Sequence, residues 1–366
     1  ETQSDKTGKG WYAYNIVREI LKMDHSSQFT LYGNSNVNPY ADFKNAILKN
    51  IAARGIRWHL KALNDLKKEK PDIFFSPTSY IIPAFAPKSL PVILTVHDLV
   101  SFLFPRNHNL KAVIIEKFTL GKAIKHARKN FTVSKNTKRD LIDHFHYPER
   151  NIIITPCAPS NLFKKQTDPK ELELLRQKLK LPQKFILSVG TIEPRKNLVT
   201  LIKSFSIIRK RFPEHGLVIV GKKGWKYNQI EIAIKHYNLQ NNIIFTGYLD
   251  SADLKKIYDL ASIFVFPSLY EGFGIPPLEA MACGVPVVSS NIASMPEVIG
   301  DCGVLIDPKN AFRMANAITD ILENEHARNI FIERGKKRAE EFTWQKSAKI
   351  ALEAIKNVYS GQSKSS

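Results

Sequence analysis

Two glutamates, Glu271 and Glu279, lie eight positions apart in the stretch PSLYEGFGIPPLEAMACGVPVV, residues 267–288. An ionised carboxylate accepts two hydrogen bonds at the spacing of a vicinal diol. Gly272 and Gly274 let backbone amides approach a ligand closely. We therefore interpret the two acids as a site for paired hydroxyl groups; a hydrated loop acid at 271 and a dipole-matched helix acid at 279 are the alternatives.

The same stretch predicts the element that positions these acids. Pro276 and Pro277 suit the first turn of a helix, and Gly284 suits the position just after its end. This arrangement places Glu271 in the loop before the helix and Glu279 within about its first turn.

A basic pair forms a second candidate site. Arg195 and Lys196 follow the apolar run KFILSVG, residues 184–190, and we expect a helix to begin near Asn197. Backbone amides and the helix dipole favour an anion at a helix start, and two cations would add charge-assisted hydrogen bonds. The pattern favours a diphosphate over a solvated basic pair, because cations are disfavoured at a helix N-terminus unless they serve an anion.

Two features of the first half carry weaker signals. His97 and Asp98 follow the run PVILTV and could form an acid and base pair, although the residues alone favour a structural histidine. Gly8, Lys9 and Gly10 are expected to form a loop ahead of a helix. This loop would face the basic pair if two sheets oppose each other across a cleft.

Short apolar runs alternate with helical patterns in the second half of the chain. Continuous apolar runs suit strands that are buried on both faces of a parallel sheet, and the patterns between them are long enough for crossover helices. We predict a doubly wound α/β domain, in which ligands bind beyond the carboxyl ends of the strands. The predicted strands are 184–190, 216–221, 242–247, 262–268, 285–290 and 303–307.

The first half repeats this plan less clearly. The predicted strands are QFTLYG, DIFFSP, PVILTVHD, NFTVS and NIIITP, and the predicted helices lie near 11–23, 112–128 and 135–144. Because no strand precedes the first helix, we expect the first strand of this domain to lie outside the sequence. The periodicity breaks near 157–170, which indicates a linker. The predicted divisions are 1–163, 164–343, and a helix within 344–362 that packs back on the first domain.

The composition is that of a folded protein with two domains and an uneven excess of positive charge. Residues 1–182 hold 30 Lys and Arg against 16 Asp and Glu, a balance of +14, and residues 183–366 hold 24 against 18, a balance of +6. A basic field attracts nucleic acid, anionic membrane or phosphorylated substrates. We expect no nucleic acid partner, because zinc-finger and RNP patterns are absent and the aromatic residues fall mostly in apolar runs.

Targeting and membrane signals are sparse. No apolar run reaches the roughly 18 to 20 residues that cross a bilayer, and the first residues lack the plan of a signal peptide. We expect a cytoplasmic protein, with peripheral association at the inner face of an anionic membrane left open. Residues 110–130 have the pattern of a basic amphipathic helix, although an ordinary packing helix with a solvated basic face is favoured. Cys157, Cys283 and Cys302 lack the paired spacing of a metal or redox site, so we expect core residues and no metal.

Several motifs resemble those of one enzyme family. SVGTIEPRKNL, VIVGKKGW, FTGYL and FPSLYEGFGIPPLEAMACGVPVVSS are similar to the retaining glycosyltransferases of family 4. These enzymes use nucleotide sugars and have two facing Rossmann-like domains, known as the GT-B fold. The similarity runs from about 184 to 347, and TGKGWYAYNIVREI, TVHDL and FTVSKNTKRDLI resemble the first domain of the family more loosely.

The resemblance implies roles for residues of the second half. Glu271 matches the first acid of the family's Glu-x7-Glu motif and would hold the donor sugar's hydroxyls, while Glu279 would hold the ribose hydroxyls. Arg195 and Lys196 match the basic diphosphate grip, although Thr191 stands where many members carry an arginine after the strand-end glycine. The other implied donor-binding residues are Gly190, Tyr248 near the base, and Gly272, Phe273 and Gly274, whose backbone would line the sugar pocket.

The resemblance also reaches the first half. It implies that His97 lies beside the transferred sugar and that Gly10 lies under the diphosphate. Nothing is carried over to Cys157 and Ala158, where members usually show Asn-Gly. His97 and Glu271 are therefore the implied catalytic residues.

The implied reaction moves a hexose, with mannose favoured, from a nucleotide sugar to a glycan or lipid-linked acceptor with retention of configuration. The GTIEPRKN loop resembles members that use GDP-mannose, and no cofactor is expected. Retention in the family is ascribed to same-face attack, in which the leaving phosphate helps to deprotonate the acceptor. A GT-B epimerase or phosphorylase, and a non-enzymatic basic protein that binds nucleotides or membranes, stay open as alternatives.

Overall fold

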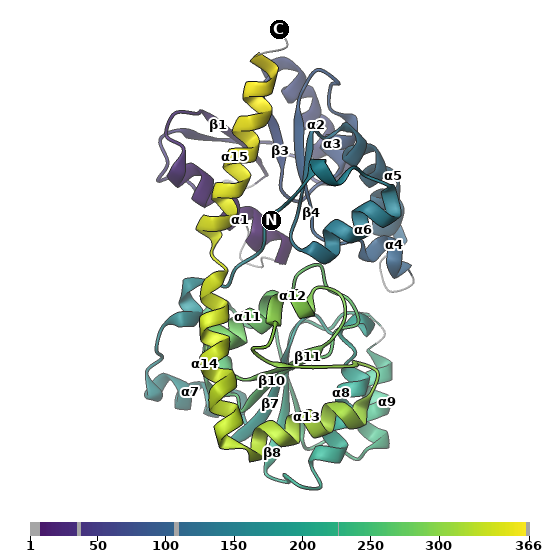
Figure 1. Ribbon diagram of the computed structural model, residues 1–366, viewed down its shortest axis with the longest axis vertical. Coiled ribbons are helices and arrows are strands. Elements are labelled where there is room, and N and C mark those ends of the chain that lie inside the picture. Colours follow the sequence, from purple (N-terminus) through teal and green to yellow (C-terminus); the bar gives the residue numbers. More distant parts are fainter. Residues whose placement is uncertain (1–7, 35–37, 106–109, 226, 364–366) are drawn as a thin grey trace. The chain divides into compact units, whose positions relative to one another are not determined.

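The computed structural model describes residues 8–34, 38–105, 110–225 and 227–363 (Figure 1). The chain divides into two compact units, of which the first comprises 1–157 and 343–366 and the second comprises 158–342. The sequence placed these divisions at 163 and 343. The further strand that was expected ahead of the first helix, outside the sequence, is not tested by the described residues and stays a prediction.

The second unit is built on a six-stranded sheet with the order β12-β11-β10-β7-β8-β9, in which all neighbours run parallel. The chain runs outward from β7 through β8 and β9, then crosses back to β10 and runs outward on the other side. The doubly wound fold predicted for this half is confirmed. The strands are β7 (Lys184–Val189), β8 (His215–Val220), β9 (Ile243–Gly247), β10 (Ile263–Phe266), β11 (Val287–Ser290) and β12 (Val304–Ile306).

Helices cover both faces of this sheet, because successive strand residues point to opposite sides and both sides are apolar. One buried layer joins Ile186 and Leu217 to α8, α9 and α13. On the other face, the ring of Tyr258 in α10 packs edge-on against Phe264 of β10. The helices are α7 (Pro169–Leu179), α8 (Leu198–Ile208), α9 (Asn228–His236), α10 (Ser251–Leu260), α11 (Ile275–Ala282), α12 (Met295–Ile299), α13 (Ala311–Glu323) and α14 (Glu325–Glu341).

The first unit contains a four-stranded parallel sheet, β3-β4-β5-β6, and a two-stranded parallel sheet, β1-β2. The strands are β1 (Phe29–Gly33), β2 (Ala46–Asn50), β3 (Phe74–Ser76), β4 (Val92–Val96), β5 (Lys129–Thr132) and β6 (Ile152–Ile154). The helices are α1 (Gly8–Met23), α2 (Gly55–Glu69), α3 (Ile81–Phe85), α4 (Val100–Leu103), α5 (Leu110–His126), α6 (Lys135–Phe145) and α15 (Trp344–Ser363).

The last helix, α15, packs against α1 within this unit (Figure 1). The Trp344 ring lies 5.9 Å from the ring of Tyr12, centre to centre. The hydroxyl of Ser347 donates a hydrogen bond of 2.6 Å to the carbonyl oxygen of Pro156. These contacts hold α15 against α1 and against the segment that follows β6.

Two sequence expectations for the first unit were wrong or incomplete. The residues Gly8 to Gly10 form the first turn of α1 rather than a loop, because glycine tolerates helical dihedrals and Tyr12 and Ile16 bury one face of the helix from the start. The sequence analysis also omitted β2 and α2. The strand β2 is a mixture of half-buried and exposed residues and ends in Lys49 and Asn50, so it lacks a continuous apolar run.

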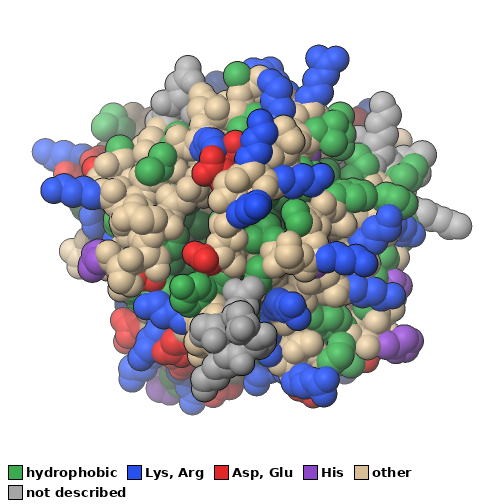
Figure 2. All heavy atoms as spheres, turned by 90° about the horizontal axis from the view of Figure 1, so that it is seen from above, with side chains coloured by type: hydrophobic (Ala, Val, Ile, Leu, Met, Phe, Trp, Pro, Cys, Tyr) green, Lys and Arg blue, Asp and Glu red, His purple; other side chains and the backbone are tan. Residues whose placement is uncertain are grey.

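The cysteines lie mainly in the interior, as expected, and basic side chains lie at the surface (Figure 2). All three cysteines are free; Cys157 and Cys302 are buried, and Cys283 is partly buried. Lys and Arg side chains are spread over the face drawn in Figure 2, with exposed apolar side chains among them. The excess of positive charge is therefore available at the surface for anionic partners.

Candidate active site

The topology of the second unit marks one edge of its sheet as a binding site. The strands β7 and β10 are neighbours, and the connections that leave their carboxyl ends run in opposite directions, toward β8 and β11. Ligands of doubly wound sheets bind at such a switch point, beyond the strand ends. The loops 190–197 and 267–274, which carry most of the predicted site residues, follow these two strands.

Glycines allow the loops after β7 and β8 to approach each other closely. Gly190 and Gly221 have φ angles of +148° and +152°. A Cβ atom on Gly221 would lie 2.0 Å from the carbonyl oxygen of Gly190. The backbone N–H of Ile192 donates a hydrogen bond of 3.0 Å to the carbonyl oxygen of Lys222. The backbone at Gly190 therefore lies so close to Gly221 that Gly221 has no room for a side chain, and both glycines have φ angles that other residues rarely adopt.

Glu271 lies between two cations. Its Oε1 is 2.6 Å from Lys196 Nζ, and its Oε2 is 2.7 Å from Arg195 Nη1. The exposed fractions of these three side chains are only 12%, 12% and 16%. Burial alone would raise the pKa of Glu271, but Arg195 and Lys196 lower it to about 2. The structure thus brings together three predicted site residues and keeps the carboxylate ionised at neutral pH.

Arg195 joins the two loops of the switch point. Its Nη2 is 2.5 Å from Glu193 Oε1, and its Nη1 donates a hydrogen bond of 2.7 Å to the carbonyl oxygen of Tyr270. The backbone N–H of Leu269 donates to the carbonyl oxygen of Arg195 at 2.8 Å. Glu193 is 5% exposed, and the sequence analysis missed it because no local pattern marks its pairing with Arg195.

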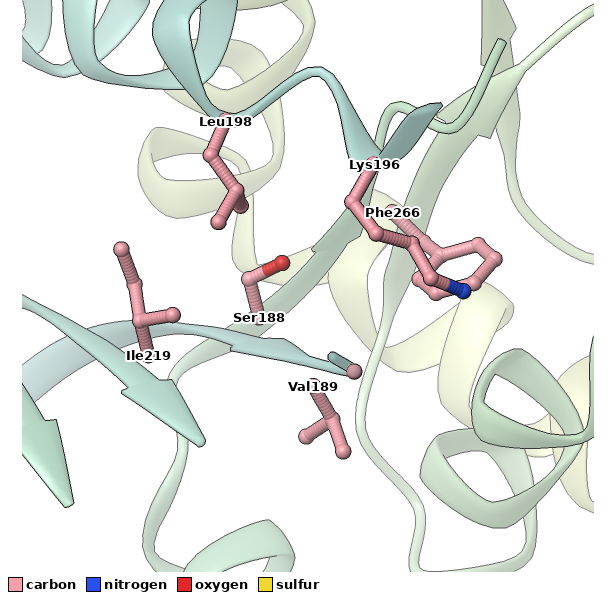
Figure 3. Close-up of a pocket in the computed structure, with 7 residues that line it drawn as sticks. Ser188, Val189, Lys196, Leu198, Ile219 and Phe266 are labelled. Atoms are coloured by element: carbon pink, nitrogen blue, oxygen red, sulfur yellow. The ribbon is translucent and has the colours of Figure 1, made fainter. Parts of the chain in front are cut away.

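Lys196 reaches across an aromatic ring to its carboxylate partner. Its Nζ lies 4.7 Å from the centre of the Phe266 ring, at the end of β10 (Figure 3). A Cβ atom on Gly190 would lie 3.1 Å from Lys196 Cε, so the glycine leaves room for the lysine. Burial lowers the pKa of Lys196, and the neighbouring Glu271 opposes that shift. A short pocket at this edge is lined by Ser188, Val189, Gly190, Lys196, Leu198, Ile219 and Phe266 (Figure 3).

The backbone of the 272–274 segment is held from behind by α12. The hydroxyl of Ser294 lies 2.7 Å from the carbonyl oxygen of Phe273 and 3.0 Å from that of Glu271. Gly274 has a φ angle of +105°, and a Cβ atom on it would lie 2.3 Å from Met295 Cε. The Phe273 side chain is buried, with its ring 5.7 Å from that of Phe342. The sequence analysis did not identify Ser294, because nothing local marks its contact with the loop.

Glu279 lies in a different environment from Glu271. Its Oε2 is 3.2 Å from the hydroxyl of Tyr258 in α10. Burial raises the pKa of Glu279 to about 7, and the hydrogen bond from Tyr258 opposes that shift. Glu279 can therefore take up a proton near neutral pH, unlike Glu271.

The helix that carries Glu279 begins and ends as its sequence predicts. Pro276 and Pro277 occupy the first turn of α11, which begins at Ile275. Gly284 has a φ angle of +74°, and its N–H donates to the carbonyl oxygen of Met281 at 3.0 Å. This is the left-handed glycine stop that follows many helices.

Tyr248 lies at the end of β9, beside the loop that follows β8. It comes directly after Gly247, whose φ angle is +76°, and its side chain is 45% exposed. Lys222 Nζ lies 4.7 Å from the centre of the Tyr248 ring. The ring and the ammonium group thus form an exposed aromatic and cationic surface at the carboxyl ends of neighbouring strands.

His97 follows β4 in the first unit and is 5% exposed. Its Nε2 is 2.8 Å from the carbonyl oxygen of Pro77, which can only accept, so Nε2 carries the proton and Nδ1 is the accepting nitrogen. Burial, and then the positive charge of Lys9, lower the pKa of His97 to about 4. The imidazole is therefore neutral at pH 7.

The helix α1 and His97 meet in the first unit. The ring of Tyr12 packs edge-on against the His97 ring at 4.9 Å, and Gly10 is buried in the same helix as Tyr12. Asp98 Oδ1 accepts a hydrogen bond of 3.2 Å from the backbone N–H of Val100 at the start of α4. The carboxylate of the His-Asp pair thus supports a helix start, while the ring nitrogen Nε2 bonds to Pro77.

The described residues contain neither a cluster of metal ligands nor a membrane-spanning helix. Within 8–34, 38–105, 110–225 and 227–363, no three His, Cys, Asp or Glu side chains are grouped as metal ligands. In the same ranges, no helix has both the length and the apolar character needed to cross a bilayer.

Comparisons with known proteins assign the chain to a family. Residues 171–338 match the family described as "Glycosyl transferases group 1", and residues 7–158 match "Glycosyltransferase Family 4". The chain is 32% identical over 296 residues to the O-antigen chain mannosyltransferase B of Escherichia coli, which covers 80% of this chain and 76% of that protein. It is 30% identical over 266 residues to the serotype-specific mannosyltransferase WbdA of Escherichia coli, and spans only 32% of that protein's length.

A solved structure has the same fold over nearly the whole chain. The crystal structure of HepE from Anabaena in complex with UDP-glucose superposes with a TM-score of 0.78 at 17% identity, covering 98% of each chain. The similarity at this level of identity concerns the fold. Together with the two family matches and the parallel-sheet units, it identifies the chain as a glycosyltransferase of family 4 with the GT-B fold.

Proposed function

We propose that this glycosyltransferase moves mannose from GDP-mannose to a glycan or lipid-linked acceptor with retention of configuration. The observation that carries the proposal is the cluster of Glu271 with Lys196 and Arg195 at the switch point of the sheet. The relative at 32% identity is named a mannosyltransferase, which supports the choice of sugar. The choice of GDP rests on the resemblance of the GTIEPRKN loop.

Lys196 is the residue best suited to the donor's diphosphate. Its Nζ has one carboxylate partner, Glu271 Oε1, at 2.6 Å. A phosphate oxygen that reached Lys196 would take the place of Glu271 Oε1 and free that oxygen for a sugar hydroxyl. Arg195 would keep its bonds to Glu193 and to Glu271 Oε2, so the carboxylate would stay in place during the exchange.

This division of roles differs from the grip implied by the resemblance, in which both cations hold the diphosphate. Arg195 is already bound by Glu193, Glu271 and the carbonyl oxygen of Tyr270. Releasing it would leave buried carboxylates with fewer partners, which costs several kcal/mol in typical cases, about 3 to 5. We therefore propose that Lys196 binds the phosphates and that Arg195 positions Glu271.

The environment of Glu271 favours attack by the acceptor over a glycosyl-enzyme intermediate. A carboxylate whose pKa is lowered to about 2 by two cations is a weak nucleophile. The leaving phosphate, stabilised by Lys196 and by loop amides, would then take the proton of the acceptor hydroxyl on the same face of the sugar. The neutral His97, with Nδ1 as acceptor, would bind a hydroxyl of the transferred sugar rather than act as an acid.

The reaction is tested with radiolabelled GDP-mannose and an extract of lipid-linked glycans. The proposal expects label on the acceptor and the same anomeric configuration in donor and product, measured by NMR. Label that stays on the nucleotide in an isomerised sugar would indicate an epimerase, and phosphate-dependent release of mannose 1-phosphate would indicate a phosphorylase. Thermal shifts with GDP, UDP and ADP sugars identify the nucleotide, because only a ligand of the folded form raises its stability.

We also propose peripheral association with an anionic membrane through an apolar surface on α5. Ile114, Ile115 and Phe118 of α5 are 58%, 50% and 59% exposed. Lys122 Nζ lies 4.2 Å from the centre of the Phe118 ring and 5.4 Å from that of Phe85 in α3. The exposed side of α5 is therefore apolar as well as basic, which is the composition that binds anionic interfaces.

Co-sedimentation with vesicles tests this association. Vesicles that contain anionic lipid should carry the protein down at low salt, and neutral vesicles should not. Ile115→Ser with Phe118→Ser should abolish sedimentation, whereas Ile232→Ser, an exposed apolar residue of the second unit, should not change it. Unchanged sedimentation of the double variant would overturn the assignment to α5.

A further inference from the structure

Tyr258 holds the second acid of the site from behind. Its side chain is fully buried, and its ring packs edge-on between Phe163 at 5.7 Å and Phe264 at 5.5 Å. Its hydroxyl lies 3.2 Å from Glu279 Oε2 and 3.3 Å from the carbonyl oxygen of Pro276. The ring contacts fix the place of the hydroxyl, so both distances follow from the packing of α10 on the sheet.

The hydroxyl of Tyr258 has one hydrogen and two neighbouring acceptors. When Glu279 is ionised, the hydroxyl can donate to Oε2. When Glu279 is protonated, the acid can donate its own proton to the tyrosine oxygen, and the tyrosine hydrogen can turn to Pro276. The same three atoms thus have two complete hydrogen-bond arrangements, which differ by one proton that Glu279 exchanges with water.

Charged groups around α11 act on Glu279 less than burial does. Burial raises the pKa of Glu279 to about 7, and the hydrogen bond from Tyr258 acts against that shift. The strands β10 and β11 carry no titratable side chain. Titratable groups on the other elements around α11 include Tyr258, Lys255 and Asp259 of α10, Cys283 after α11, Lys164 of the segment 161–164, Glu297 of α12 and Lys336 of α14.

We propose that Tyr258 is a positioning residue for the donor's ribose: it holds ionised Glu279 so that the carboxylate meets the ribose hydroxyls, and it turns to Pro276 when Glu279 takes up a proton. The inference rests on the proposed function, which assigns the ribose hydroxyls to Glu279. It adds a residue with no expected contact to the donor. It also makes nucleotide affinity rise with pH as Glu279 ionises, because only the carboxylate accepts from both ribose hydroxyls.

Tyr258→Phe tests this inference, because it removes the hydroxyl and keeps the ring. The readout is GDP affinity by calorimetry from about pH 5.5 to about pH 8.5. We expect about tenfold weaker binding at pH 7, typical of a lost hydrogen bond to a charged group. The midpoint of the pH dependence should move to higher pH, because the Tyr258 bond lowers the pKa of Glu279 in the wild type.

Three controls separate positioning from general damage. A GDP analogue without the ribose hydroxyls should bind the wild type and Tyr258→Phe equally well, whereas a merely structural loss would weaken both ligands. Glu279→Gln should remove the pH dependence, and adding Tyr258→Phe to it should change the profile no further. Tyr147→Phe removes a buried hydroxyl that bonds to the Ala127 carbonyl in the first unit and should leave GDP binding unchanged.

The experiments distinguish a failure of the role proposed for Tyr258 from a failure of the proposed function. If Tyr258→Phe binds GDP with the wild-type affinity and pH midpoint, or loses GDP and the analogue equally, the role of Tyr258 is overturned while nucleotide binding stands. If the wild type binds none of GDP, UDP and ADP, the proposed function fails and the inference fails with it.

Discussion

The loop that carries Glu271 and the helix that carries Glu279 shift the pKa values of two glutamates in opposite directions. Both carboxyls are largely buried, so burial acts to raise the pKa of each. In the loop, Lys196 and Arg195 outweigh burial and hold the pKa of Glu271 at about 2. In the helix, Tyr258 opposes burial only weakly, and the pKa of Glu279 is about 7.

The comparison shows how one sequence motif can supply two electrostatic functions. A carboxylate between two cations stays charged, keeps its position and accepts hydrogen bonds at any physiological pH. A carboxyl that faces a tyrosine can gain or lose a proton near neutrality and so can respond to its ligand and to pH. The difference comes from the partners that the fold brings to each acid.

The largest effect on activity should follow from removing the charge of Glu271. Glu271→Gln keeps the size of the side chain but removes the charge that two buried cations face. We expect a loss of roughly 2 to 4 kcal/mol in transition-state stabilisation, measured from kcat/KM for mannosyl transfer. Glu333→Gln, at an exposed position of α14, is the matched control. Full activity of Glu271→Gln would remove this residue from the site.

Stability against pH should show opposite signs for the two acids. The folded-state pKa of Glu271 is lowered from 4.5 to about 2, so its contribution is present above pH 4.5 and is lost as the pH falls toward 2. The folded-state pKa of Glu279 is raised from 4.5 to about 7, so its ionisation destabilises the fold as the pH rises through that window. Each shift corresponds to about 3 kcal/mol.

The measurement compares each glutamine variant with the wild type by urea unfolding at several pH values. As the pH rises from about 4.5 to about 7, the wild type should lose unfolding free energy relative to Glu279→Gln. As the pH rises from about 2 to about 4.5, the wild type should gain unfolding free energy relative to Glu271→Gln. The same sign for both variants would contradict the contrast between the two environments.

The two cations should separate binding from stability. Lys196→Met should weaken GDP binding by about 10- to 30-fold, roughly 1.5 to 2 kcal/mol, because it removes the proposed phosphate ligand. Arg195→Met should instead lower the thermal unfolding temperature, because it removes the ion pairs with Glu193 and Glu271 and the hydrogen bond to the Tyr270 carbonyl oxygen. Lys203→Met, on the exposed side of α8, serves as control. Equal loss of GDP affinity in both variants would instead show that Arg195 and Lys196 both bind the diphosphate.

A smaller effect should follow from loosening the loop behind Glu271. Ser294→Ala removes the hydroxyl that faces the carbonyl oxygens of Glu271 and Phe273, and we expect a loss of about 1 kcal/mol in unfolding free energy. Ser204 is the matched control, because its buried hydroxyl has no hydrogen-bond partner in the described part of the chain. Ser204→Ala should therefore cost nothing, and an equal cost for both variants would argue against a specific role of Ser294.

Much of the second unit could be predicted because its signals are local. The strand β10 (Ile263–Phe266) and its neighbours are continuous apolar runs in the sequence, and Pro276, Pro277 and Gly284 mark the limits of α11. The first unit was harder to predict. Its strand β2 is short and half-exposed, and the glycines at the start of α1 resemble a loop in sequence while Tyr12 packing makes them helical.

The sequence by itself determined where the two acids and the basic pair lie along the chain, and which of them follow strands. Only the tertiary structure decided their partners: Lys196 meets Glu271 across 75 positions, and Tyr258 meets Glu279 across 21. Local patterns record the backbone preferences of near neighbours. The charge state of a buried carboxyl depends instead on what the packed strands and helices bring within a few ångströms of it.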